Sequence, residues 1–352
     1  MIQTIPSDGY FIEIGAIQES SFSEFLDEKY ASSKKVIFVD ENTQEYCLEY
    51  VLTSFEQLAE AEIIAIPAGE ENKSLDICVH IWSALTEYGI KRNDVIINLG
   101  GGMITDLGGF IASVYLRGID FINIPTSLLA MVDASAGGKT GIDFEGLKNQ
   151  LGVFANPQLV VCDPCFFSTL PQDEFLSGKA EMLKHGVIQG RETWDKAKVV
   201  TPRNISVEAI SRSISVKNAI VLEDFKEKNS RKKLNLGHTI GHALESYFLS
   251  IKPVPHGICV AWGLVIEALL ALQDKQLSTN DFQEIQHVIS SCYPSLKIEE
   301  PEIPLIINFL SYDKKNQNSE INFSLIKGFG DVEINHTFNQ TAIQQAIKAT
   351  LC

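Results

Sequence analysis

Short apolar runs alternate with amphipathic segments between about residue 10 and residue 165 of this chain. The apolar runs have the length of buried strands and cover residues 35–39, 62–66, 95–99, 121–124 and 159–161. Between them, apolar residues at i, i+3 and i+4 spacing predict helices over residues 75–85 and 104–116. Because strands that alternate with helices pair in parallel, this half is predicted to be an α/β domain with helices covering a parallel sheet.

The second half of the chain has a different pattern, with longer amphipathic segments. These segments predict a mostly α-helical domain and cover residues 173–187, 206–226, 236–247, 258–273 and 280–289. Residues 321–326 and 332–334 are typical of a small hairpin, with glycines between the two strands. We expect the boundary near residue 165, which gives domains 1–165 and 166–352.

Size and charge exclude several classes of function. With 352 residues the chain is long enough for two separate cores. A formal net charge of −16 argues against a nucleic-acid partner, because nonspecific binding to phosphate backbones requires a basic surface. The longest nearly apolar run, 258–272, is short for a membrane span and contains Glu267, and the N-terminus shows no leader pattern. The scattered, odd-numbered cysteines predict no disulfide framework. We expect a cytoplasmic protein that binds neither membrane nor nucleic acid.

A run of three glycines, Gly100 to Gly102, lies between the strand at 95–99 and the helix at 104–116. Glycine lets the backbone approach an anion, and a helix N-terminus supplies free N–H groups and a partial positive charge. The turn therefore suits a pyrophosphate, although contiguous glycines differ from the G-x-G-x-x-G dinucleotide motif. Asp40 follows the strand at 35–39, where an acidic residue can accept hydrogen bonds from a ribose. The alternatives are a tight turn without a ligand and a solvated turn carboxylate.

Two imidazoles, His238 and His242, are spaced to share one helix face. The pair can be two metal ligands, one ligand and one acid–base group, or two structural histidines. Thr239 after the first histidine excludes the zinc-peptidase motif, which requires glutamate there. Together with Glu181 and His256, His238 would complete two imidazoles and one carboxylate, a set that leaves a coordination position open for substrate. Because these donors and the glycine turn lie on opposite sides of the boundary, we expect a reaction centre between the domains.

An anionic small substrate is compatible with the acidic total if cations gather locally in a cleft. Each candidate cation has a solvated surface charge as its alternative interpretation. The candidates are Arg117, Lys139, Lys148, Lys184, Lys217, Arg231 and Lys314.

The order of the motifs resembles the 3-dehydroquinate synthase family over roughly residues 36–330. The motifs that carry the resemblance are Gly100-Gly101-Gly102 to Asp106, Arg117-Gly118, Ile124-Pro125-Thr126, Val132-Asp133, Gly137-Gly138-Lys139-Thr140-Gly141, Lys148-Asn149, Thr169-Leu170-Pro171, Ala180-Glu181, Lys184, Leu234-Asn235-Leu236-Gly237-His238-Thr239, Gly241-His242-Ala243, His256-Gly257 and Asp313-Lys314-Lys315. The departures are Thr105 in place of Gly, Ser127 in place of Thr and Asp143 in place of Asn. Thr105 would narrow the nucleotide turn, and Asp143 would add a negative charge near an anionic substrate.

The resemblance implies a Rossmann-like NAD domain followed by a helical metal- and substrate-binding domain, and a homodimer. It also implies a cyclase that converts 3-deoxy-D-arabino-heptulosonate 7-phosphate, a small anionic sugar phosphate, to 3-dehydroquinate and phosphate. In that reaction NAD+ oxidises a ring carbinol, phosphate is eliminated, the hydride returns, and ring opening and an aldol step close the carbocycle. NAD+ is therefore recycled, and a divalent metal, Zn2+ or Co2+, is required.

The resemblance also implies roles for individual residues. The metal ligands match Glu181, His238 and His256, which leaves His242 as the acid–base imidazole. Phosphate contacts match Lys139, Asn149 and Asn235, with Arg117 from a neighbouring subunit, and Lys314 or Lys315 would close over the phosphate. Groups around the carboxylate and hydroxyls match Lys184, Lys217 and Arg231. NAD contacts match Asp40, Glu70, Lys73, Gly101, Gly102, Asp106, Thr126, Ser127, Lys139, Lys148, Phe166 and Thr169.

Three other functions remain as alternatives. A metal-dependent alcohol or polyol dehydrogenase would release its NADH and would not need so many cations. A sister sugar-phosphate cyclase would act on a substrate without a carboxylate, against which Lys217 and Arg231 argue. The third alternative is an NAD-binding scaffold without catalysis.

Overall fold

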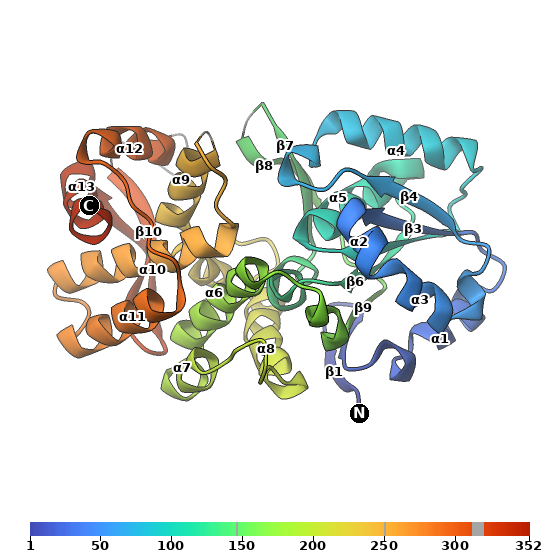
Figure 1. Cartoon of the computed structure of the whole chain (residues 1–352), viewed down its shortest axis with the longest axis horizontal. Coiled ribbons are helices and arrows are strands. Elements are labelled where there is room, and N and C mark those ends of the chain that lie inside the picture. The colour runs from blue at the N-terminus through green and yellow to red at the C-terminus, as the bar shows by residue number, and fades with distance from the viewer. Residues whose placement is uncertain (146, 250, 312–319) are drawn as a thin grey trace. The chain divides into compact units, whose positions relative to one another are not determined.

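The computed structural model describes residues 1–145, 147–249, 251–311 and 320–352, and these form two compact units (Figure 1). The first unit contains Met1–Pro171 and Ile205–Asn218, and the second contains Gln172–Asn204 and Ala219–Cys352. The first unit thus continues past residue 165 and includes a later segment. Beyond residue 165, Phe166 packs edge-on against Tyr50 of the same unit. In the later segment, Asn218 donates to the Pro6 carbonyl at 2.8 Å.

A parallel sheet forms the core of the first unit. Its strands, as far as the structure describes the chain, are in the order β1-β2-β9-β6-β5-β3-β4, with only β1 antiparallel to its neighbour. The strands are β1 (Gln3–Pro6), β2 (Phe11–Ile14), β3 (Lys35–Asp40), β4 (Glu62–Ile66), β5 (Val95–Gly100), β6 (Asp120–Pro125) and β9 (Leu159–Cys162). The helices are α1 (Phe22–Glu24), α2 (Glu41–Tyr46), α3 (Leu48–Ser54), α4 (Leu75–Glu87) and α5 (Gly102–Val114). The predicted α/β fold with a parallel sheet is confirmed.

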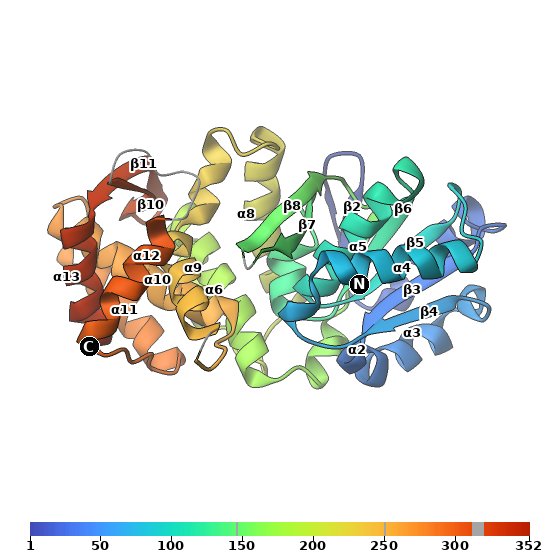
Figure 2. The ribbon, with the colours of Figure 1, turned by 90° about the horizontal axis from the view of Figure 1, so that it is seen from above.

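Helices cover both faces of this sheet. Figure 2 shows α4 and α3 on opposite sides of strands β3 and β4. Every residue of β5 is buried, as the continuous apolar run at 95–99 requires. One face packs against α4 and α5 through a core that includes Phe38, Ile96, Ile81 and Leu107.

The strand order reverses between β3 and β5, since β4 lies beyond β3 on one side and β6 beyond β5 on the other. In open α/β sheets, ligands bind outside the carboxyl ends of the strands at this reversal point. Asp40 ends β3, and the glycine run begins at Gly100, the last residue of β5. The fold therefore places both sequence-predicted nucleotide signals at the expected edge.

Two strand pairs of the first unit were not predicted from the sequence. One is β1 with β2 at the sheet edge. The other is an antiparallel hairpin of β7 (Lys139–Phe144) and β8 (Leu147–Phe154), which forms a separate two-stranded sheet. The glycine-rich motif 137–141 thus lies at the start of a strand.

The second unit is mostly helical, as predicted. Its elements are α6 (Gln172–Gln189), α7 (Arg191–Lys198), α9 (His238–Leu249), α10 (His256–Gln273), α11 (Thr279–Cys292), α12 (Ile303–Ser311), α13 (Gln340–Leu351), the predicted hairpin of β10 (Glu320–Gly328) and β11 (Asp331–Asn339), and the end of α8 (Val207–Glu223). Helix α10 is central and packs against α6, α9, α11 and α13 (Figure 1). Among the described residues it is the one helix with the length and composition of a membrane span, but 78% of that window is buried inside the fold.

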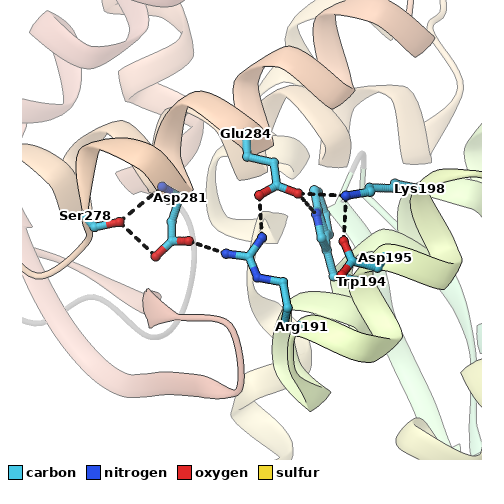
Figure 3. Close-up of polar contacts among 7 residues, drawn as sticks. All are labelled: Arg191, Trp194, Asp195, Lys198, Ser278, Asp281 and Glu284. Carbon is cyan, nitrogen blue, oxygen red and sulfur yellow. Dashed lines mark hydrogen bonds and ion pairs between the residues drawn. The ribbon is translucent and has the colours of Figure 1, made fainter.

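A polar network joins α7 to α11 in the second unit (Figure 3). Glu284 accepts hydrogen bonds from Arg191, from Trp194 Nε1 at 2.9 Å and from Lys198 Nζ at 3.0 Å. Arg191 also pairs with Asp281 at 2.5 Å, and its guanidinium lies 3.8 Å from the centroid of the Phe329 ring. One arginine therefore connects α7, α11 and the turn between β10 and β11.

Candidate metal centre and nucleotide site

Three imidazoles gather on neighbouring helices of the second unit. His238 and His242 lie one turn apart on α9, and His256 is the first residue of α10. A ring nitrogen of each lies within 4.8 Å of those of the other two. Glu181 of α6 reaches the same group, with Oε1 3.4 Å from Nε2 of His238. The structure thus brings together the four residues that the sequence analysis assigned to the metal and to acid–base chemistry.

Hydrogen bonds orient two of the three imidazoles. Nδ1 of His238 lies 3.1 Å from the Leu236 carbonyl, and Nδ1 of His256 lies 3.0 Å from Oε2 of Glu245. Because both partners are acceptors, each Nδ1 carries a proton, which leaves Nε2 as the nitrogen that a neutral ring offers to a metal. A carboxylate or carbonyl behind a histidine is the usual support for a metal-ligating imidazole. His242 is the exposed member of the three.

The electrostatics of the site suit a cation. Glu181 is completely buried, and neither carboxylate oxygen accepts a well-directed hydrogen bond from a described residue, although Lys184 forms an ion pair with it. A buried carboxylate requires compensating positive charge. Burial, together with Lys184, His242 and His256, lowers the pKa of His238 well below its usual value, so this imidazole is neutral, as a ligand must be. The donors present therefore fit a divalent metal.

Close approaches between helices set the positions of these donors. A Cβ at Gly257 would lie 2.1 Å from the Ser177 carbonyl, so the start of α10, with His256, packs directly on the backbone of α6. A Cβ at Gly263 would lie 2.1 Å from the Gly237 carbonyl, which brings α10 equally close to the start of α9. Only glycine permits both contacts, and they explain why three helices converge on one small site.

The remaining second-unit candidates, two buried cations and the partly buried Asn235, each contact a polar acceptor. Lys184 is 2% exposed and pairs with Glu181. Arg231 is also 2% exposed, and Nη1 donates to the Phe225 carbonyl at 2.6 Å. Asn235 Nδ2 donates to Oε1 of Glu227 at 2.7 Å. Lys217 belongs to the first unit, where Nζ contacts Oδ1 of Asp133 at 2.8 Å and the Asp133 carbonyl at 2.5 Å.

In the first unit, the glycine turn has the predicted strand–turn–helix geometry. Gly101 precedes α5 with extended backbone, and Gly102 is the first helical residue. The Thr126 N–H donates to the Gly100 carbonyl at 3.0 Å, which holds the turn against the end of β6. The Thr105 hydroxyl turns back to the Gly102 carbonyl at 3.1 Å. The first N–H groups of α5 therefore remain available to an anion.

Lys73 connects the nucleotide turn to the β7–β8 hairpin. It is 3% exposed, and Nζ lies 2.8 Å from Oδ2 of Asp106 and 2.7 Å from Oδ1 of Asn149. Although burial opposes the charged form, Asp106 and Glu70 outweigh it and raise the pKa of Lys73. Asn149 has a left-handed backbone with φ +50°, and its N–H donates to Asp143 at 2.7 Å. Asp143, which stands where the family usually has Asn, thus holds the backbone of Asn149, a predicted phosphate contact.

Other predicted nucleotide residues lie along the same unit. Asp40 uses Oδ1 to cap α2 through Thr43 N at 2.8 Å, so part of its carboxylate serves the turn. Nζ of Lys148 lies 3.7 Å from Oε1 of Glu70. Phe166 is buried edge-on to Tyr50, and the Thr169 hydroxyl bonds to the Phe166 carbonyl at 3.4 Å. The Ser127 hydroxyl accepts from Ala130 N at 3.2 Å.

Arg117 and Lys139 are exposed on the first unit. Arg117 ends a short turn, Tyr115–Arg117, in a left-handed conformation with φ +69°. Lys139 is the first residue of β7. Lys314 and Lys315 lie outside the described residues.

Two supporting residues were missed by sequence reasoning. Glu245 lies behind His256, and the completely buried Glu267 accepts hydrogen bonds at the start of α9. An acidic residue inside an otherwise apolar helix was the available signal for Glu267.

Comparison with known proteins decides the family. The family described as 3-dehydroquinate synthase N-terminal matches residues 63–177, and 3-dehydroquinate synthase C-terminal matches residues 178–316. A 3-dehydroquinate synthase from Parabacteroides distasonis is 41% identical over 337 residues, which are 94% of each chain. One from Staphylococcus aureus is 33% identical and spans 97% of this chain and 96% of its own. This chain belongs to the 3-dehydroquinate synthase family. It is therefore a lyase of the phosphate-eliminating cyclase type.

Solved structures show that the 3-dehydroquinate synthase fold is shared more widely. A 2-deoxy-scyllo-inosose synthase with carbaglucose-6-phosphate, NAD+ and Co2+ matches with TM-score 0.87, 23% identity and full coverage of both chains. A 2-epi-5-epi-valiolone synthase from Streptomyces hygroscopicus with NAD+ and Zn2+ matches with TM-score 0.83 and 22% identity, and the match covers 99% of each chain. The NADH-dependent butanol dehydrogenase A from Thermotoga maritima matches with TM-score 0.69 and 14% identity, and the match covers 99% of this chain and 98% of the dehydrogenase. At these identities the likeness concerns the fold alone.

Proposed function

We propose that this chain converts 3-deoxy-D-arabino-heptulosonate 7-phosphate to 3-dehydroquinate and phosphate, a step of the shikimate pathway that leads to aromatic amino acids. Family membership supports the reaction class. The observation that carries the substrate is that two buried cations, Lys184 and Arg231, belong to the same unit as the histidine cluster. Buried cations of this kind suit a substrate with an additional carboxylate.

Both cofactors are part of the proposal. Glu181, His238 and His256 would hold a divalent metal, Zn2+ or Co2+, which when bound polarises a substrate oxygen. The carboxyl edge of the first-unit sheet would hold NAD+, which when bound accepts and returns a hydride. Gly101 and Gly102 would face its pyrophosphate, and Asp40 would accept from a ribose hydroxyl. Two structural neighbours contain NAD+ together with Co2+ or Zn2+.

The chain's own side chains then handle protons and charge. A ring nitrogen of His242, exposed beside the two oriented imidazoles, takes a proton from a substrate hydroxyl and passes it on. Arg231, Lys184 and Lys217 neutralise the substrate carboxylate and fix its hydroxyls. Lys139, Asn149 and Asn235 bind the phosphate, and Asn149 is preorganised for this by Lys73 and Asp143.

The test follows phosphate release and 3-dehydroquinate formation from the heptulosonate phosphate. Purified protein with NAD+ and Zn2+ or Co2+ should form both products in equal amounts, and a chelator should stop the reaction until metal is restored. If glycerol or butanol is oxidised and the heptulosonate phosphate is not consumed, the proposal is wrong.

We also infer a cytoplasmic homodimer. The first unit exposes apolar side chains on α5, on the turn after it and on the β7–β8 hairpin, namely Val114, Leu116, Phe144, Leu151, Val153 and Phe154. Large apolar side chains that remain exposed on one unit suit an interface between subunits, where association buries them. Arg117 directly follows Leu116 in the chain. This position suits the role that the family resemblance implies for Arg117, which is to contact the phosphate in a neighbouring subunit. The seven cysteines are present as thiols and not as disulfides, which suits a reducing compartment.

A further inference from the structure

Helices α9 and α10 run side by side in opposite directions, and one stripe of α10 faces α9. The stripe contains His256, Val260, Gly263 and Glu267, whose spacings of four, three and four residues keep them on a single helix face. Opposite them lie Glu245 near His256, Gly241 against Val260, and Gly237 against Gly263. The last member, Glu267, therefore reaches the first turn of α9.

Glu267 is completely buried and is aimed at backbone donors. Its Oε2 accepts from Gly237 N at 2.5 Å, and its Oε1 accepts from Ile240 N at 3.2 Å. Both carboxylate oxygens therefore have a backbone donor. These donors are N–H groups at the start of a helix, which have no acceptor within the helix itself. Burial raises the pKa of Glu267 to about 8, and the same backbone donors oppose that rise.

We propose that Glu267 is a positioning residue for the metal site, because it caps helix α9 from outside and so fixes the backbone on both sides of His238. The inference rests on the proposed role of His238 as a ligand. Gly237, the residue before His238, and Ile240, two residues after it, both donate to Glu267. Gly237 itself has no side chain that could cap the helix.

The arrangement is reciprocal. Glu245 of α9 holds the imidazole of His256, the first residue of α10, while Glu267 of α10 holds the backbone around His238, the first residue of α9. Each helix thus supplies a carboxylate to the ligand-bearing start of the other. Groups that orient ligands in this way typically contribute about 10- to 100-fold to metal affinity.

The experiment compares Glu267→Gln with the parent and with Glu284→Gln. Glu284 is also a carboxylate that accepts several hydrogen bonds within this unit, but it lies on α11 and joins α7 and α11. Metal-free protein is titrated with Co2+ while the visible absorption of the bound ion and the thermal unfolding midpoint are recorded. Binding of NAD+, assigned to the first unit, serves as a check that the rest of the chain is intact.

We expect Glu267→Gln to bind Co2+ about 10- to 100-fold more weakly and to shift the absorption bands, because the geometry around His238 changes. Glu284→Gln should lower the unfolding midpoint and leave Co2+ affinity within about 2-fold of the parent. Unchanged affinity and spectrum in Glu267→Gln would overturn the inference. If that variant does not fold, Glu267→Asp, which keeps the carboxyl group but withdraws it from the helix, should show intermediate affinity, and parental affinity there would also overturn the inference.

Failure of the proposed metal site gives a different result. In that case His238→Ala binds Co2+ as the parent does, whatever Glu267→Gln shows.

Discussion

At the scale of single residues, hydrogen bonding and exposure distinguish the proposed metal ligands from the proposed acid–base group. His238 and His256 have Nδ1 bonded to acceptors, whereas His242 is exposed. We therefore expect His256→Ala to lose metal while NAD+ binding persists. His242→Ala should retain metal and lose about 10²- to 10⁴-fold in kcat, the range typical of acid–base groups. Metal content after dialysis, measured beside kcat, checks this. Full metal occupancy in His256→Ala would contradict the ligand assignment.

Arg231 tests whether the site reads a carboxylate. A buried ion that loses its partner costs several kcal/mol, so Arg231→Met should lower kcat/KM by about 10²-fold, or about 2.7 kcal/mol at 1.36 kcal/mol per decade. A substrate analogue with hydrogen in place of the carboxylate should be poor for the parent and lose little more in the variant. Equal losses with both substrates would remove the main physical reason to prefer this cyclase over those whose sugar-phosphate substrates have no carboxylate.

Sequence spacing predicted that His238 and His242 lie together, because both belong to one helix. Glu181 and His256 could be named as possible further donors, but spacing alone could not select them, since the close approaches at Gly257 and Gly263 depend on tertiary packing. The same packing explains why Glu245 and Glu267 were missed. Their partners lie 11 and 30 residues away in sequence, beyond any local pattern.

At the scale of elements, long periodic segments were predictable and short ones were not. Strands β3, β4 and β5 follow their apolar runs, and α6 and α11 follow their amphipathic patterns. The hairpin β7–β8 was not predicted, because its glycines interrupt the alternation of apolar and polar residues that marks a strand. Helix α8 was predicted to reach residue 226 but ends at Glu223, because the Asp224 carboxylate accepts from the N–H groups of Lys228, Asn229 and Arg231 and forms a loop.

The network between α7 and α11 gives a pH-dependent prediction (Figure 3). Burial opposes ionisation of Glu284, but hydrogen bonds from Lys198, Trp194 and Arg191 outweigh it and lower its pKa from 4.5 to about 2. A carboxyl whose pKa is lower in the folded state stabilises the fold above its unfolded pKa, and this stabilisation is lost as pH falls through the folded value.

Glu284→Gln should therefore lower the free energy of unfolding by about 1–2 kcal/mol at pH 7, after allowance for solvent screening of a partly exposed group. The difference from the parent should shrink as pH falls from 4.5 toward 2. Urea unfolding at several pH values measures this difference in the free energy of unfolding. The control is Glu300→Gln, which removes an exposed ion pair with Lys348 and should have a small effect. A difference that stays constant down to acidic pH would argue against this role.

At the scale of the whole molecule, the proposed homodimer depends on the apolar surface of the first unit. Phe154 is 45% exposed on β8, so Phe154→Asp should place an uncompensated charge in the interface and give monomers. Phe309→Asp changes a residue that is 40% exposed on the second unit and should leave association unchanged. Sedimentation velocity distinguishes the two. A Phe154→Asp protein that sediments as the parent does would place the subunit contact elsewhere.

The central claim is that the first unit's nucleotide and the second unit's metal serve one cyclisation without net redox. The most direct measurement supplies the heptulosonate phosphate in large excess over a fixed, substoichiometric amount of NAD+ and follows phosphate and the absorbance of NADH together. Because the hydride returns to the substrate, we predict many phosphates released per NAD+ with no steady accumulation of NADH. Turnover that stops after one equivalent, with NADH formed in proportion, would contradict the account and indicate a dehydrogenase.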